Sequence, residues 1–186
     1  MKRLSSLILR LFGWKVSITV PDYPKSIICV APHTSNWDFI LGKLAYASVG
    51  RKAGFLMKKF WFFWPLGPIF KSMGGVPVGG NTGVSLTAQL IERFKTSAKL
   101  NVAITPEGTR ARTSRWHTGF LHVALEANVP ITLAYIDFPT KTINMSETFV
   151  PSGDISADMK RIKEYFRPYT GKYADKFSTD TETDGQ

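Results

Sequence analysis

The sequence predicts a single α/β domain: a mostly parallel central sheet flanked by helices and preceded by a short amphipathic helix. The chain has 186 residues, a length that suits one domain with a sizeable core. Hydrophobic residues make up 44% and charged residues 20%, which is an ordinary globular balance and not that of a disordered chain. Short apolar runs alternate with helical patterns, as they do where helices connect parallel strands.

Residues 1–15 are expected to form the amphipathic N-terminal helix. Apolar residues recur there at the spacing of one helical face, with basic residues around them, at Leu4, Leu7, Ile8 and Leu11. Such a helix suits a membrane interface and the core of its own domain equally well, and the sequence leaves both open.

The body of the domain is expected to cover residues 16–177. Residues 26–31 form a continuous apolar run of strand length, which is typical of a strand buried on both faces. Strands are predicted at residues 16–20, 26–31, 53–57, 100–105 and 130–138, and helices at residues 37–49, 83–95, 119–127 and 154–169. Ser35 or Asn36 caps the first of these helices, and Ser152 or Asp154 caps the last. Residues 178–186 are rich in Thr and acidic residues and are predicted to be a disordered tail.

The positive charge is concentrated in the first half of the chain. Residues 1–91 carry 11 Lys and Arg but only two acidic residues, while the net charge of the whole chain is +10. This asymmetry indicates an anionic partner: nucleic acid, a membrane surface or a phosphorylated small molecule.

Several classes of protein are excluded by simple counts. One cysteine, Cys29, rules out a disulfide framework and a cysteine-based zinc site, and its apolar surroundings predict a buried thiol. The most apolar stretch, residues 60–70, is too short to span a membrane and contains two prolines. The N-terminus lacks a cleavage site of the secretory type, so we expect a cytoplasmic protein or one on a membrane facing the cytoplasm. His117 and His122 lack a third ligand at zinc spacing and are interpreted as structural, and no metal is expected.

Two predicted buried strands end in clusters of polar residues, at residues 31–38 and 105–110. Ligands of open parallel sheets bind where the strands end.

In the first cluster four residues separate His33 from Asp38, so the carboxylate can reach the imidazole across the helix start. Such a carboxylate fixes the imidazole tautomer and strengthens the other nitrogen as a general base. On spacing alone, the stronger interpretation is that His33 lies in a turn and Asp38 caps the helix.

The combination of motifs changes that balance. His33-x4-Asp38, followed about seventy residues later by Pro106-Glu107-Gly108-Thr109-Arg110, resembles the glycerolipid acyltransferases of the lysophosphatidate acyltransferase type (1-acyl-sn-glycerol-3-phosphate acyltransferases). The resemblance covers residues 25–140. Further matching stretches lie at Lys58 and residues 65–67, 74–78, 118–120 and 129–131.

The resemblance implies a direct transfer reaction without a cofactor. His33, supported by Asp38, deprotonates the hydroxyl of a lysophospholipid acceptor, which attacks the thioester of acyl-CoA or acyl-carrier protein. Membrane lipids are the implied partners, with the enzyme peripheral on the cytoplasmic side. The resemblance also implies an acceptor pocket formed by Glu107, Gly108, Thr109, Arg110 and Lys58. Arg110 suits phosphate oxygens because its guanidinium is a planar fork of donors.

One departure puts the acceptor in doubt. After the stretch matching residues 74–78 the family typically has an acidic residue and an arginine for the acceptor phosphate, whereas residues 78–81 here are Val-Gly-Gly-Asn. Three explanations stay open: a different acceptor, such as a lyso amino-lipid; compensation by Arg110, Lys58 or Lys71; or a glycine-rich backbone cradle.

Two other functions remain as alternatives. A nucleic-acid-binding module would use the basic, aromatic-rich first half, although the contiguous block at residues 60–64 suits a lipid interface better. A catalytically lapsed lipid-binding relative would explain the missing arginine. Arg110, Arg112 and Arg115 form a basic cluster that suits the phosphates of coenzyme A, the acidic face of a carrier protein, or plain solvent exposure.

Overall fold

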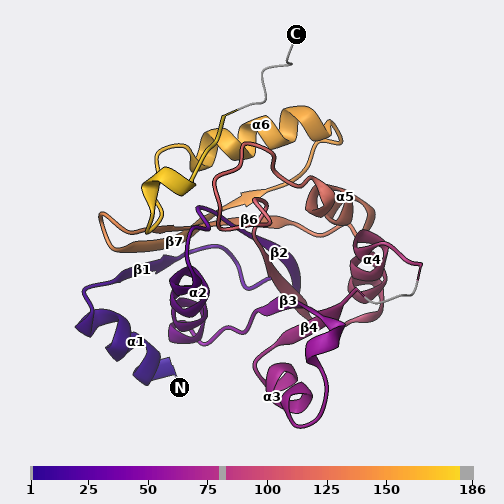
Figure 1. Cartoon of the computed structure of the whole chain (residues 1–186), viewed down its shortest axis with the longest axis horizontal. Coiled ribbons are helices and arrows are strands. Elements are labelled where there is room, and N and C mark those ends of the chain that lie inside the picture. The colour runs from indigo at the N-terminus through magenta and orange to yellow at the C-terminus, as the bar shows by residue number, and fades with distance from the viewer. Residues whose placement is uncertain (1, 80–82, 181–186) are drawn as a thin grey trace.

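The computed structural model describes residues 2–79 and 83–180. It is a three-layer α/β domain in which a central sheet lies between two groups of helices (Figure 1). The helices are α1 (Lys2–Leu11), α2 (Asn36–Ser48), α3 (Leu66–Ser72), α4 (Leu86–Thr96), α5 (Gly119–Glu126) and α6 (Ile155–Phe166), with 3-10 turns η1 (Lys59–Trp61) and η2 (Ala174–Lys176). Helices α5 and α6 cover one face of the sheet, and α1 and α2 cover the other.

The sheet has seven strands in the order β1-β7-β6-β2-β5-β3-β4. The strands are β1 (Lys15–Ile18), β2 (Lys25–Val30), β3 (Gly54–Lys58), β4 (Gly75–Val78), β5 (Leu100–Ile104), β6 (Ile131–Asp137) and β7 (Thr142–Phe149). All neighbouring pairs are parallel except β6 and β7, which are antiparallel. The predicted fold class is therefore confirmed.

Strand β2 is buried on both faces, as its continuous apolar run predicts. Ile27 and Cys29 pack into the large cluster beneath α4, α5 and α6, whereas Ile28 packs on the opposite face near Tyr46 of α2. The alternation is that of a central parallel strand covered by helices on both sides. A central strand with this burial holds the loop that follows it in a fixed position.

Three elements were not predicted from the sequence: α3, β4 and β7. Strand β7 pairs antiparallel with β6 and alternates between buried residues such as Ile143 and exposed ones such as Ser146. Its polar residues hide the continuous apolar run that marks the other strands. Helix α4 starts at Leu86 and not at residue 83 because the Ser85 side chain accepts a hydrogen bond from the Ala88 N–H and caps the helix there.

Helix α1 packs on the domain while its predicted apolar stripe faces outward. Leu9 is buried in a cluster with Leu41 of α2 and Ile143 of β7. In contrast, Leu4, Leu7 and Leu11 are exposed. One face of α1 therefore packs on the core of its own domain, and the opposite face is an exposed apolar surface.

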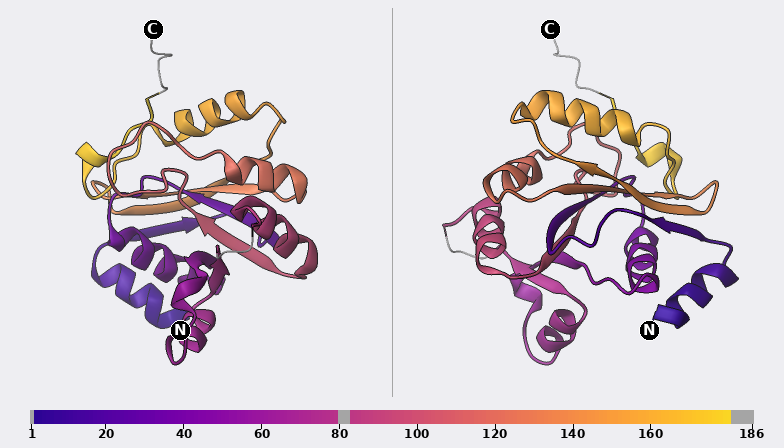
Figure 2. Two further views of the ribbon diagram at one scale, coloured as in Figure 1. Left: turned by 45° about the vertical axis from the view of Figure 1, so that its right-hand side comes forward. Right: turned by 180° about the vertical axis from the view of Figure 1, so that it is seen from behind.

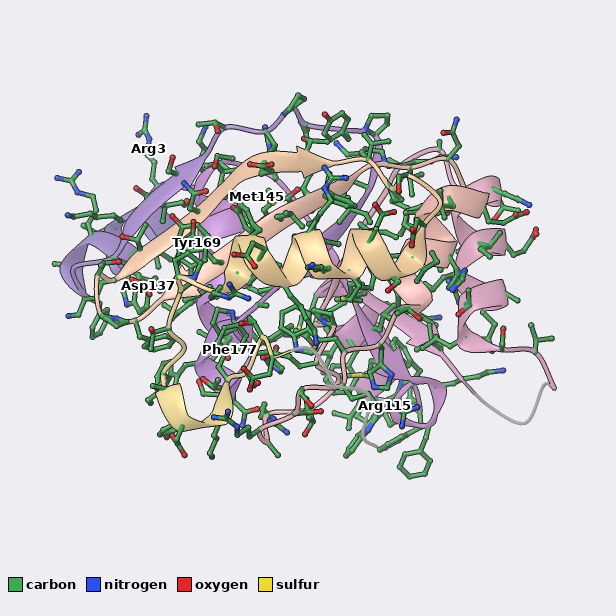
Figure 3. The ribbon with its side chains drawn as sticks, turned by 90° about the horizontal axis from the view of Figure 1, so that it is seen from above. Arg3, Arg115, Asp137, Met145, Tyr169 and Phe177 are labelled. Carbon is green, nitrogen blue, oxygen red and sulfur yellow. The ribbon has the colours of Figure 1, made fainter. Side chains whose placement is uncertain are left out.

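The C-terminal segment folds back toward the loop that follows β2. The Tyr173 N–H donates to Thr34 Oγ1 at 3.2 Å, and the Trp116 ring N–H donates to the Ser178 carbonyl at 3.1 Å. Figure 3 looks down on α6 and shows Tyr169 and Phe177 along this segment. Ser178 is buried, although the sequence assigns it to the disordered tail, because this return path packs it against Trp116. Residues 181–186 of that tail lie outside the described residues.

Within the described ranges, no helix combines the length and the apolar character needed to cross a membrane.

Candidate active site

The two predicted polar clusters lie side by side at one edge of the sheet. Strands β2 and β5 are parallel neighbours, and Cys29 pairs with Ile104 near their carboxyl ends. His33 follows β2 and Glu107 follows β5, so the parallel register brings together side chains that are far apart in the sequence. The sheet thus supplies the edge at which open α/β folds bind their ligands.

Asp38 caps the start of α2. Its carboxylate oxygen Oδ2 accepts hydrogen bonds from the backbone N–H groups of Thr34 and Ser35, each at 2.8 Å. The Ser35 side chain accepts in turn from the Trp37 N–H at 3.1 Å, which completes a capping box with Asp38. The capping role that the sequence favours on spacing alone is confirmed.

The same carboxylate also lies against the imidazole of His33. Oδ2 is 3.2 Å from His33 Nδ1, and the Asp38 side chain is almost fully buried. The direction of the ring N–H does not suit a hydrogen bond to Oδ2, so Nδ1 has no hydrogen-bond partner within the described chain. Asp38 therefore combines the two roles that the sequence offers as alternatives: it caps the helix and lies in contact with Nδ1. Nε2 is left as the nitrogen that can take a proton.

Glu107 is buried behind His33. Only 4% of its surface is exposed, and its carboxylate accepts a hydrogen bond from the His33 backbone N–H. Its other oxygen, Oε2, has no partner among the described residues. The pKa of Glu107 is raised to about 8, chiefly by burial and to a smaller extent by the nearby charge of Asp38, while the hydrogen bond from His33 lowers it. At neutral pH the side chain is consequently mostly a neutral carboxylic acid.

Gly108, Thr109 and Arg110 form the turn after Glu107. Gly108 has φ +64°, and a Cβ there would lie 2.5 Å from the His117 ring, so both the backbone and the packing require glycine. Thr109 Oγ1 accepts a hydrogen bond from the Ala111 N–H, and the Arg110 guanidinium donates to Asn36 Oδ1 at the start of α2. Lys58 ends β3 at the same edge of the sheet, but its side chain lies outside the described part of the structure.

An apolar cavity of about 390 Å³ opens between α2 and the sheet and reaches His33. Its walls come from α2 and from the sheet face opposite α5 and α6, and include Val30, Phe55, Ala134 and Met145. Gly42 lies on the cavity side of α2, one turn after Asp38 and one turn before Tyr46, and a Cβ added there would meet nothing within 4 Å. The cavity suits an aliphatic chain.

A second, polar pocket of about 590 Å³ also borders His33. It is lined by His33, Thr105, Gly108, Thr109, Arg110, Ala111 and Lys176. His33 and Thr105 line both cavities, so the imidazole stands at their junction. Glu107, expected to bind substrate, lies behind this wall and is absent from the described lining of either cavity.

Three features of the pocket were missed from the sequence: the pairing of Arg110 with Asn36, and the positions of Tyr173 and Lys176. The sequence indicates Asn36 only as a candidate helix cap. Nothing in the composition or spacing of residues 167–180 indicates that they return to the site, since their place depends on tertiary contacts such as that between Tyr173 and Thr34.

The structure also shows the surroundings of other residues that the sequence singled out. Cys29 is buried, and desolvation together with the charge of Glu107 raises the pKa of its thiol, so it stays an inert thiol inside β2. Among the described residues, no group of three or more His, Cys, Asp or Glu side chains could hold a metal ion. Lys71 lines neither cavity, and the Gly79 N–H is already bonded to Gln89 Oε1. Gly80 and Asn81 lie outside the described residues.

Comparisons with known proteins bear on the family and the fold of the chain. The model of the family described as Acyltransferase matches residues 17–136, a range that includes both polar clusters. Among solved structures, the crystal structure of the 1-acyl-sn-glycerophosphate (LPA) acyltransferase PlsC from Thermotoga maritima is similar, with a TM-score of 0.60 and 15% sequence identity. The match covers 90% of this chain and 77% of that chain, and at this identity it establishes a shared fold. No curated protein matches the sequence significantly.

Proposed function

The chain belongs to the acyltransferase family, and on this premise we propose that it transfers a fatty acyl group from a thioester donor to the hydroxyl of a lysophospholipid-like acceptor. The donor is acyl-CoA or acyl-carrier protein. The observation that carries the proposal is the position of His33 at the junction of an apolar cavity and a polar pocket. A reaction that joins an aliphatic chain to a polar headgroup needs its base at such a junction.

His33 acts as the general base. Asp38 lies 3.2 Å from Nδ1 and orients the ring, so Nε2 takes the proton of the acceptor hydroxyl. The acceptor oxygen then bonds to the thioester carbonyl carbon and the carbon–sulfur bond breaks. The proton held by His33 passes to the departing thiolate, so no acyl-enzyme forms and the reaction needs neither a metal nor a cofactor.

The two cavities take different parts of the substrates. The acyl chain of the donor enters the apolar cavity, whose walls are largely aliphatic and aromatic. The headgroup of the acceptor enters the polar pocket, where Arg110 and Thr109 offer donors. Glu107, buried behind His33 and hydrogen-bonded to its backbone, positions the histidine from the far side.

Peripheral attachment to the cytoplasmic side of a membrane completes the proposal. Exposed apolar side chains gather on α1 and on the segment that leads into α3, at Leu4, Leu7, Leu11, Phe60, Trp61, Phe63 and Trp64. In Figures 1 and 2 both segments lie on the α2 side of the sheet, away from α6. Basic residues flank them, which favours an anionic leaflet.

The reaction is tested by an acyl-transfer assay with the full chain. Donors are acyl-CoA and acyl-carrier protein of several chain lengths, and acceptors include lysophosphatidate, a lyso amino-lipid and monoacylglycerol. We expect ester formation with at least one lysolipid and a clear chain-length preference. Hydrolysis of the thioester alone, with no acylated acceptor in any combination, would contradict the proposal.

Membrane attachment is tested by liposome flotation. Replacing Leu4, Leu7 and Leu11 by Ser leaves the buried Leu9 in place, so it removes the apolar face without removing a core residue. Each fully buried leucine contributes about 1.5–3 kcal/mol, so flotation on anionic vesicles should fall at least tenfold. Leu125→Ser with Val150→Ser, exposed positions on α5 and directly after β7, is the control and should float like the original protein. Equal flotation of all three proteins would exclude α1 as an anchor.

A further inference from the structure

The polar pocket contains a cation that comes from outside the matched family region. Lys176 belongs to η2 and lines the pocket together with His33 and Arg110. The family match ends at residue 136, so this lysine is supplied by a part of the chain that the family model does not cover.

The C-terminal segment holds Lys176 at the pocket by contacts on both sides of η2. Before it, the Tyr173 N–H donates to Thr34 Oγ1, and Gly171 packs so closely on Thr34 that a Cβ would lie 2.6 Å from the same oxygen. After it, the Ser178 carbonyl accepts from the Trp116 ring. Because Thr34 directly follows His33, the segment is fastened to the catalytic loop itself.

The charge of this pocket is not neutralised within the described chain. Arg110 is bonded to the neutral amide of Asn36, and Lys176 lies 4.6 Å from the centre of the Tyr173 ring. None of the ion pairs among residues 2–79 and 83–180 involves Arg110 or Lys176. Arg112 nearby is different, because Asp180 pairs with it at 3.3 Å. Two unpaired cations facing one polar pocket attract an anion of matching charge.

We propose that Lys176 binds a substrate phosphate group in the polar pocket together with Arg110, and that it replaces the arginine missing after Val78. This inference rests on the proposed function and deepens it. Arg110 provides a planar fork for two phosphate oxygens, and the lysine ammonium provides a mobile point charge with three donors. The phosphate belongs either to the acceptor headgroup or to the phosphopantetheine part of the donor, and the chemistry of recognition is the same.

Equilibrium binding without turnover tests this inference independently of the reaction. Isothermal titration calorimetry on the full chain measures the affinity for glycerol 3-phosphate and for coenzyme A. Lys176→Gln removes the charge, Lys176→Arg retains it, and Lys160→Gln on the exposed side of α6 is the matched control. Since a charge-assisted hydrogen bond is lost, Lys176→Gln should weaken binding about tenfold, whereas the other two variants should stay within about twofold of the original protein.

The two ligands distinguish the source of the phosphate. A loss confined to glycerol 3-phosphate assigns Lys176 to the acceptor, and a loss confined to coenzyme A assigns it to the donor; both outcomes support the inference. Equal affinities of Lys176→Gln and Lys160→Gln for both ligands would overturn it. Failure of the original protein to bind either ligand would also overturn it. If that protein still transferred acyl groups to a phosphate-free acceptor, the proposed function would remain intact.

Discussion

The two cavities that meet at His33 are built in different ways. The apolar cavity is walled by α2 and by one face of the sheet, that is, by regular elements of the domain core. The polar pocket is walled by the turn after β5 and by the C-terminal segment, that is, by loops held by a few hydrogen bonds. Under the proposed function, recognition of the acyl chain therefore depends on side-chain volume, whereas recognition of the headgroup depends on charge. Each cavity should therefore respond to one kind of substitution.

The largest effect is expected where the cavities meet. His33→Ala removes the proton acceptor and leaves the other walls of both cavities in place, so kcat should fall by ~10²–10⁴. Binding of coenzyme A and of glycerol 3-phosphate, measured by calorimetry, should stay within about threefold. A variant that no longer binds either ligand would show that His33 holds the walls of the polar pocket in place and that its effect on rate is indirect.

Glu107, behind the junction, should control stability and not specificity. Its folded pKa of about 8 lies above the ordinary value of 4.5, so the folded state binds the proton more tightly than the unfolded state. The free energy of unfolding should therefore fall as the pH rises from 4.5 to 8, with a slope on the order of 1 kcal/mol per pH unit, and change no further above that range.

Glu107→Gln has nearly the same shape and cannot ionise, so it should lack this component of the pH dependence. Urea denaturation at pH 5, 6.5 and 8 measures both proteins. Parallel stability profiles for the two proteins would mean that Glu107 is ionised in the folded state throughout.

The proposed function puts the acceptor headgroup in the polar pocket, so a charge change there should affect the acceptor more than the donor. Arg110→Gln should raise KM for a phosphorylated acceptor by about 10-fold to 100-fold, since a charge-assisted contact contributes about 1.5–3 kcal/mol. KM for the acyl donor should change less than threefold. Steady-state kinetics with a phosphate-free acceptor is the control, and the same loss with that acceptor would contradict a phosphate role for Arg110.

A volume change in the apolar cavity should affect the donor alone, with a smaller effect. Gly42→Leu adds four carbons to the empty side of α2, and each methylene of acyl chain displaced from the cavity costs about 0.8 kcal/mol. The preferred donor should become shorter by two to four carbons (about the volume added), with kcat/KM for the longest donors about tenfold lower. Gly42→Ala is the matched control and should keep the original preference; an unchanged profile for Gly42→Leu would place the acyl chain elsewhere.

Much of the fold and the centre of the site followed from local patterns. The apolar run of β2 predicted a buried strand, and the polar clusters after β2 and β5 predicted a binding site where these parallel strands end. Spacing alone favoured the capping role of Asp38 over contact with His33, but the same carboxylate does both.

The rest depends on tertiary packing. Strand β7 was missed because its polar residues obscure the apolar pattern, and Lys176 because the return of its segment is set by single contacts such as that of Tyr173 with Thr34. The empty space beside Gly42 depends on the distance between α2 and the sheet, and no pattern in the sequence predicts that distance.

Under the proposed function, the two cavities recognise their ligands independently and share only the chemistry at His33. A double-mutant cycle of Gly42→Leu and Arg110→Gln, read as kcat/KM for a long-chain donor with a phosphorylated acceptor, tests it most directly. Independent sites predict that the two losses multiply, with a coupling free energy below about 0.5 kcal/mol. A coupling of about 1.5 kcal/mol or more, or a chain-length profile that shifts in Arg110→Gln alone, would contradict separate cavities and indicate one shared binding site.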